Sequence, residues 1–163
     1  MAIWQADCGY LANAKLASWV KDAGSTCAKL KAHDLQLKIK NVERVTSWNC
    51  SQQENCGWLR TSVLSVDGFP WMLAQAWVED SVDNAQEIQS LQSERPLGLW
   101  LFANNSAWQR SAFSYTLPVN FQQLVAEYFL KPAVAVRKSN FNNQSGVDLI
   151  LLEVFLQHDI WNE

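Results

Sequence analysis

The chain has 163 residues, of which 48% are hydrophobic and 18% are charged, a balance that is typical of a globular protein and excludes a disordered or collagen-like chain. Its length predicts a single domain, residues 1–163, with a core large enough to need no disulfide or metal for stability. Because phosphate binding needs a clustered excess of Lys and Arg, a formal net charge of −3 without such a cluster excludes a general nucleic-acid binder.

A helical corner is predicted at the start of the chain. Apolar residues recur near helical spacing from Leu11 to Val20, and the run 22–25 that follows supplies a stop. Ser25 is a reasonable N-cap for a second helical turn through Leu30, because its hydroxyl can accept from an unpaired backbone N–H. No helix-turn-helix module is expected, since strand-like sequence begins almost at once.

Three strands are predicted next. Residues 35–48 alternate with period two, which predicts a strand that faces a core. Two further apolar runs, 58–66 and 69–78, follow a polar break. Asp67-Gly68 lies between them and predicts a hairpin turn, because both residues tolerate positive φ.

The second half of the chain mixes helical and strand-like segments. Residues 81–91 have the spacing of an amphipathic helix, whereas the apolar segment 97–102 fits a helix or a strand. The remaining segments are a weakly alternating stretch, a helical stretch and two strands: 107–117, 121–129, 133–141 and 147–156. Consecutive strands with tight turns, and helices in separate runs, predict an α+β fold with a largely antiparallel sheet.

The cysteines and histidines suggest no metal site. Cys8, Cys27, Cys50 and Cys56 form no CxxC pair, and the chain has two isolated histidines. Free thiols are therefore expected, with a pairing of Cys50 and Cys56, which flank a polar loop, left open.

No segment predicts a membrane span or an export signal. The longest apolar stretches, around Leu149–Leu152, fall far short of the roughly 20 residues that cross a bilayer. The N-terminus has no basic start followed by an apolar core. We expect no membrane insertion and a cytoplasmic protein, and nothing in the sequence demands an oligomer, so we expect a monomer.

Glu153 is the first candidate for a functional side chain. It interrupts a run of apolar residues, 149–156, that is typical of a strand buried on both faces. A buried carboxylate needs a partner, or its pKa rises. The pattern fits a satisfied structural acid and a site residue equally well.

Arg60 poses the same question on another strand. It shares a face with Trp58, Ser62 and Leu64, among strand-forming residues. Its guanidinium is always charged and suits bidentate binding of a carboxylate. A pocket containing Arg60 and Glu153 is one interpretation, and a buried salt bridge between them is the other.

Five short motifs, in this order and spacing, resemble those of the chorismate lyase family: Trp58-Leu59-Arg60, Asp67-Gly68-Phe69-Pro70-Trp71, Pro96-Leu97-Gly98, Arg137-Lys138-Ser139 and Leu152-Glu153-Val154-Phe155-Leu156. Each is weak alone, but together with the Gly24-Ser25 corner they extend from residue 24 to Leu156, over nearly the whole chain. The resemblance implies a cofactor-free, metal-free lyase of ubiquinone biosynthesis that converts chorismate to 4-hydroxybenzoate and pyruvate. It also implies a six-stranded antiparallel sheet with helices and lid-like flaps over an internal cavity.

The resemblance assigns roles to particular residues. Arg60 would bind the ring carboxylate, and Glu153 would lie at the hydroxyl end of the ligand and assist proton handling. Thr26 would belong to a flap and Leu97 to the wall of the site. Gln75 stands where the family usually has an Arg, and we expect it to contact the substrate.

A non-catalytic domain that binds a small aromatic acid is the alternative interpretation. The effector domains of GntR-type regulators are similar in fold to the chorismate lyase family and also capture small metabolites. Absence of a DNA-binding module in the sequence favours the enzyme.

Overall fold

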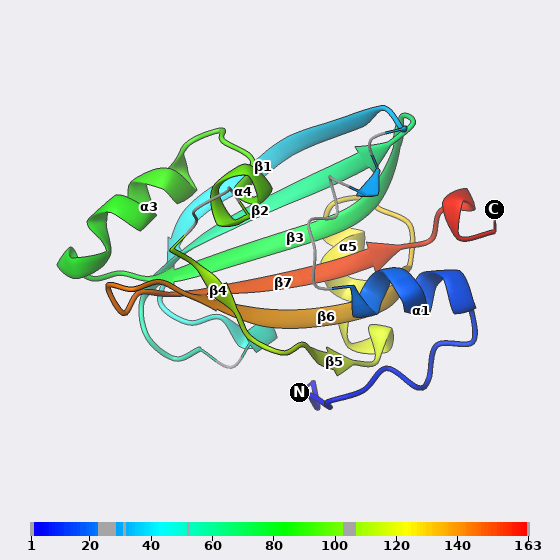
Figure 1. Cartoon of the computed structure of the whole chain (residues 1–163), viewed down its shortest axis with the longest axis horizontal. Coiled ribbons are helices and arrows are strands. Elements are labelled where there is room, and N and C mark those ends of the chain that lie inside the picture. Colours follow the sequence, from blue (N-terminus) through cyan, green and yellow to red (C-terminus); the bar gives the residue numbers. More distant parts are fainter. Residues whose placement is uncertain (1, 23–28, 31, 52, 103–106, 163) are drawn as a thin grey trace.

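The computed structural model describes residues 2–22, 29–30, 32–51, 53–102 and 107–162. One antiparallel sheet dominates this part of the chain (Figure 1), with the strand order β1-β2-β3-β7-β6-β4 and a further short strand, β5, beside β6. The strands, in chain order, are Leu35–Val45, Gly57–Val66, Phe69–Glu79, Gln109–Arg110, Ser114–Thr116, Ala133–Asn142 and Asp148–Leu156. The predicted antiparallel α+β fold is confirmed, and β5 adds a seventh strand to a path of six.

Tight turns join the central strands as the sequence predicts. Asp67 and Gly68, at φ 53° and 87°, connect β2 to β3, and Gly146, at φ 81°, lies in the connection from β6 to β7. Along β3 the register changes by one residue, because Pro70 pairs with Ser65 whereas Met72 pairs with Leu64. Trp71 is therefore the extra residue of a β-bulge.

Four helices accompany the sheet in the described ranges: α1 (Ala14–Lys21), α3 (Ala85–Gln92), α4 (Leu97–Leu101) and α5 (Gln122–Glu127). The Asn13 side chain caps α1 by accepting from the backbone N–H of Leu16. The undecided segment 97–102 is helical, and the helix predicted over 81–91 begins instead with a 3-10 turn, Val82–Asn84. None of these helices is long and apolar enough to cross a bilayer. The predicted cap at Ser25 lies outside the described residues.

The helices lie on both faces of the sheet (Figure 1), with α1 and α4 on one face and α5 on the other. Successive residues of a strand point to opposite faces, so β7 contributes to both layers. Leu152 and Val154 pack with Val125 of α5, whereas Leu149 and Leu151 pack with Leu101 of α4. The β7 strand is therefore covered on both sides, as its apolar sequence predicts.

Strand β1 differs from the prediction that it faces a closed core. It lies at one end of the strand order, and its residues are exposed or half-buried. Leu37 is 38% exposed, and together with Leu35 it lines a cavity. The alternating apolar residues Leu35 and Leu37 therefore form part of a cavity wall at the edge of the sheet.

Three of the cysteines have the free thiols that the sequence predicts. Cys8 is buried, and Cys50 and Cys56 are half-buried and unpaired. The disulfide left open between Cys50 and Cys56 is not formed.

Candidate active site

A cavity of about 310 Å³ lies on the face of the sheet that α4 covers. This volume is at the lower end of the roughly 300–1,000 Å³ typical of ligand sites, and it suits a ligand with one ring. Most of its lining is apolar and comes from β1, β2, β3, β7 and the α4 region: Leu35, Leu37, Leu64, Met72, Ala74, Pro96, Leu97, Gly98, Leu101, Phe102 and Leu151. Polar side chains enter it from Arg60, Ser62 and Glu153. An apolar cavity with a few placed polar groups can orient a small polar ligand.

Arg60 is a buried cation that borders this cavity. Only 1% of the residue is exposed, and burial lowers the pKa of its guanidinium, which nevertheless stays charged. Its Nη1 donates to the backbone carbonyls of Arg95 at 2.7 Å and Ser93 at 3.4 Å, and its Nε has no hydrogen-bond partner. Within the described ranges no carboxylate forms a salt bridge with it. A buried charge that is solvated by carbonyls alone favours an anionic ligand.

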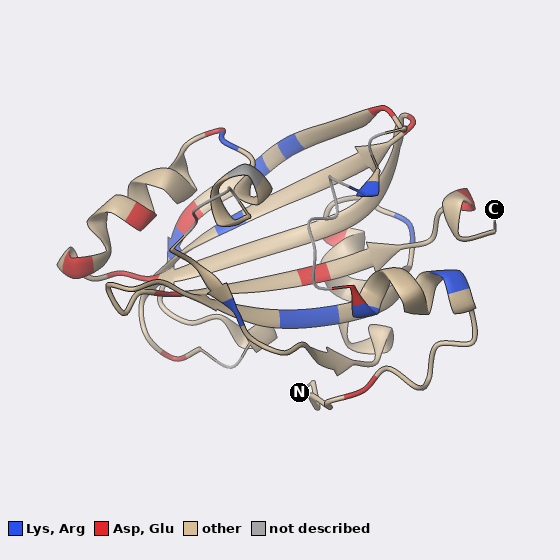
Figure 2. Ribbon diagram, in the orientation of Figure 1, with Lys and Arg blue, Asp and Glu red and all other residues tan. Residues whose placement is uncertain are grey.

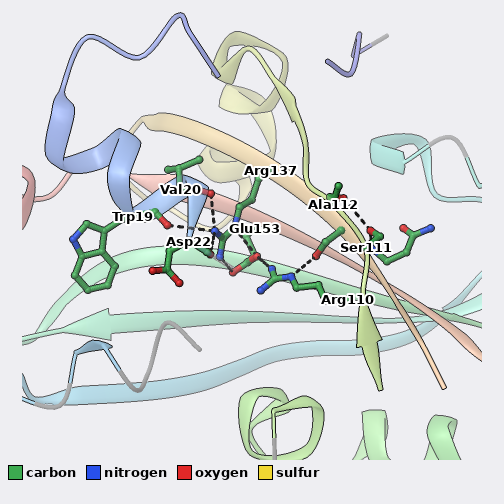
Figure 3. Close-up of polar contacts among 10 residues, drawn as sticks. Trp19, Val20, Asp22, Arg110, Ser111, Ala112, Arg137 and Glu153 are labelled. Carbon is green, nitrogen blue, oxygen red and sulfur yellow. Dashed lines mark hydrogen bonds and ion pairs between the residues drawn. The ribbon is translucent and has the colours of Figure 1, made fainter. Parts of the chain in front are cut away.

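Glu153 is held by a neighbouring arginine from β6. Arg137 lies opposite it in the register and donates from Nε to Oε1 at 2.8 Å and from Nη2 to Oε2 at 3.0 Å. The Arg137 Nη1 donates in turn to backbone carbonyls at the C-terminal end of α1, including that of Val20 at 2.7 Å (Figure 3). These carbonyls carry partial negative charge at a helix end, so they help to stabilise the guanidinium.

Arg110 of β4 is a second cation on the same carboxylate. Its Nη2 donates to Oε1 of Glu153 at 2.7 Å (Figure 3). Its Nε donates to the Ser139 hydroxyl at 3.0 Å. Its guanidinium also lies 4.3 Å from the ring centre of Phe113 and 5.0 Å from that of Phe141. One short strand thus fixes an arginine against the middle of the sheet.

The two arginines keep Glu153 ionised. Burial alone would raise the pKa of its carboxyl group, but the charges and hydrogen bonds of Arg137 and Arg110 outweigh that effect and lower it. Figure 2 shows the acidic position within β7 beside basic positions on β6. With Arg60 included, three arginines face one glutamate, which gives these buried or nearly buried groups a summed charge of +2.

The alternative interpretation, a salt bridge between Arg60 and Glu153, is wrong, because Glu153 forms its ion pairs with Arg110 and Arg137. The interpretation as a shared pocket holds, since both residues line the same cavity. Arg60 pairs with Ala76 and Glu153 pairs with Ala74, so β3 lies between them. Two strand spacings of about 4.8 Å separate their backbones and leave room for a ring between the side chains.

Gln75 does not line the cavity, so the structure does not bring it together with Arg60 and Glu153, and its contact with substrate stays a prediction. Its side chain accepts from Trp48 Nε1 at 3.1 Å and donates to the Thr61 hydroxyl at 3.1 Å, on the opposite face. The bulge at Trp71 sets this orientation, because a one-residue shift of register moves every later side chain of the strand to the other face. Leu97 does line the cavity, and Thr26 lies outside the described residues.

Sequence reasoning missed two of the charged residues. Arg137 interrupts an apolar strand in the same way as Arg60 and Glu153, so the same argument would have found it. Arg110 lies in a two-residue strand within a weakly alternating stretch, and no local pattern marks it.

Comparison with known proteins shows which family this chain is similar to. A profile described as chorismate lyase matches residues 1–163. A probable chorismate pyruvate-lyase of Shewanella amazonensis is 29% identical over 99 residues, which span 58% of this chain and 52% of that protein. The chorismate pyruvate-lyase of Erwinia tasmaniensis is 29% identical over 113 residues, which span 63% of this chain and 64% of that protein. The matching regions thus span about half to two thirds of these relatives.

Among solved structures, the effector domain of PhnF from Mycobacterium smegmatis is similar to this fold. The TM-score is 0.51 at 13% sequence identity, over 82% of this chain and 88% of that chain. This likeness supports the architecture of the sheet and its helices, and it carries no argument about the ligand.

Proposed function

Because the chain belongs to the chorismate lyase family, we propose that it eliminates pyruvate from chorismate to give 4-hydroxybenzoate. The observation that carries the proposal is Arg60, a buried cation that borders an apolar cavity and has only carbonyl partners among the described residues. We infer that the ring carboxylate of the substrate supplies its missing anion, because guanidinium and carboxylate pair strongly when water is excluded.

Glu153 would take the opposite end of the ring. Among the described residues its Oε2 accepts one hydrogen bond, from Arg137, and so keeps capacity to accept another from the ring hydroxyl of the substrate. Because its pKa is lowered, the carboxylate is a weak base at neutral pH, and we propose that it orients the hydroxyl more than it removes a proton.

The summed charge supports the choice of substrate. Chorismate carries two carboxylates. Arg60 and Glu153 line the cavity, and with Arg110 and Arg137, which contact Glu153 without lining the cavity, these groups sum to +2. A dianion therefore gains more from this cavity than a monoanion of the same size would.

The reaction makes modest chemical demands. The enolpyruvyl group leaves one ring carbon, a proton leaves its neighbour, and formation of the aromatic ring supplies the driving force. Orientation and charge neutralisation in a cavity that excludes water would account for most of the catalysis, so we propose that no cofactor takes part. The 4-hydroxybenzoate formed would serve ubiquinone biosynthesis.

The test is to mix the purified protein with chorismate, with a chelator present, and to measure pyruvate in a coupled assay and 4-hydroxybenzoate by absorbance. We expect both products in equal amounts, and no turnover from Arg60→Ala. Arg44→Ala is the matched control, since Arg44 lies on β1 with half of its side chain exposed and does not line the cavity. No pyruvate above the spontaneous background would overturn the proposal, and binding of 4-hydroxybenzoate without turnover would favour a non-catalytic binding domain.

A further inference from the structure

Ser62 is the uncharged polar side chain of the cavity lining. The residue is 4% exposed, lies on β2 and lines the cavity with Arg60 and Glu153. Among the described residues its hydroxyl has no hydrogen-bond partner, and its oxygen is not among the fully buried unpaired atoms, so it is open to the cavity that the residue lines. A hydroxyl in that position favours a ligand atom that completes its bonding.

The sheet register fixes where this hydroxyl lies relative to the two charged groups. Ser62 is two residues from Arg60 on the same face of β2. Ser62 pairs with Ala74 on the neighbouring strand β3, and Ala74 pairs in turn with Glu153 on β7. Ser62 and Glu153 therefore lie in one cross-sheet row, with the small Ala74 side chain between them.

A ring that extends from Arg60 to Glu153 presents one edge to Ser62. The ring hydroxyl of the ligand would be bound by Glu153, and Ser62 lies in the same cross-sheet row as Glu153. The ring carbon nearest to the Ser62 hydroxyl is therefore the one next to the carbon that carries the ring hydroxyl. We propose that Ser62 Oγ donates a hydrogen bond to an oxygen on that neighbouring carbon, so that the cavity selects rings oxygenated at both adjacent positions. The inference rests on the orientation given by the proposed function.

In chorismate the oxygen on that carbon is the ether oxygen of the enolpyruvyl group. During elimination the carbon–oxygen bond breaks and its electron pair stays on the oxygen. The adjacent C–H loses its proton, its electron pair completes the aromatic ring, and the enolpyruvate takes up a proton at carbon to become pyruvate. Ser62 keeps its own proton and stabilises the negative charge that develops on the leaving oxygen.

Two product-like acids test the inference by titration calorimetry. We expect the wild type to bind 3,4-dihydroxybenzoate about five-fold more tightly than 4-hydroxybenzoate, the value of one neutral hydrogen bond of about 1 kcal/mol. Ser62→Ala should bind both acids equally and 4-hydroxybenzoate as the wild type does. Its kcat on chorismate should also fall about five-fold or more. Ser65→Ala is the matched control, because Ser65 is on the same strand and does not line the cavity.

The outcomes separate the two proposals. If neither acid binds and no pyruvate forms, the proposed function fails and this inference fails with it. If 4-hydroxybenzoate binds but the second hydroxyl adds no affinity in the wild type, the role of Ser62 alone is overturned. A gain in affinity that persists in Ser62→Ala overturns it as well. Near-ultraviolet circular dichroism checks the fold of the variant, and the comparison of the two acids in the wild type needs no variant.

Discussion

Replacement of Glu153 by Gln should destabilise the protein strongly at neutral pH. The change keeps the size of the side chain but removes the charge that neutralises Arg137 and Arg110, whose guanidinium groups are nearly or fully buried. An amide has one accepting oxygen, and its NH₂ group would point at a guanidinium that also donates.

The magnitude follows from the contacts that are lost. Glu153 accepts charge-assisted hydrogen bonds at 2.7, 2.8 and 3.0 Å. Removing one partner of such a buried ionic group costs about 3–5 kcal/mol, because the remaining charges stay buried without compensation. This is a large share of the roughly 5–15 kcal/mol by which a typical domain is stable.

The difference should depend on pH in one direction. The pKa of Glu153 is lowered in the folded protein, so its ionised form stabilises the fold above the unfolded-state pKa of about 4.3. That contribution is lost as the pH falls from there through the folded-state pKa. The wild type should therefore approach Glu153→Gln in stability below pH of about 4.

Urea unfolding followed by tryptophan fluorescence, from pH 7 downward, measures both effects. The matched control is Glu43→Gln, since Glu43 is an exposed residue of β1. If Glu153→Gln unfolds at the same urea concentration as the wild type at pH 7, or if the gap does not narrow in acid, the reasoning about the buried charges is wrong.

Three further changes test the cavity and its charges. Arg60→Lys keeps the charge but loses the planar fork, so calorimetry should show about ten-fold weaker binding of 4-hydroxybenzoate; unchanged affinity would refute bidentate binding. Arg110→Met removes the hydrogen bonds to Glu153 and Ser139 and leaves the Arg137 pair, so urea unfolding should show a loss of at least about 1.5–3 kcal/mol, the value of the bond to Glu153. Ala74→Phe fills the cavity floor, so binding should be lost while overpacking costs about 1–3 kcal/mol; retained binding would place the ligand elsewhere.

The sequence predicted the parts of this fold that local patterns determine. The Asp67-Gly68 turn, the strands on either side of it and the two C-terminal strands all follow from residue periodicity and turn chemistry. Charges inside apolar strands also identified Arg60 and Glu153, since a strand that is covered on both faces leaves a charge few places to lie.

What the sequence could not predict depends on register and on distant pairing. An uninterrupted two-residue hairpin would place Gln75 opposite Arg60, and the bulge at Trp71 places Ala76 there instead. No local pattern signals that bulge, because Trp71 continues the apolar run. The partners of Glu153 come from β4 and β6, and only the three-dimensional structure shows that Arg110 reaches the middle of the sheet.

The position of β1 links ligand binding to protection against aggregation. A strand at the end of a sheet offers unpaired backbone groups to other molecules, and charged residues such as Lys38 and Lys40 on β1 oppose that encounter. The same strand supplies Leu35 and Leu37 to the cavity wall, so a bound ring would contact the strand from inside and hold it against β2. Occupancy of the cavity would then reduce local opening of the sheet edge. The bound ligand would thus stabilise β1 and oppose edge-to-edge pairing of β1 with strands of other molecules.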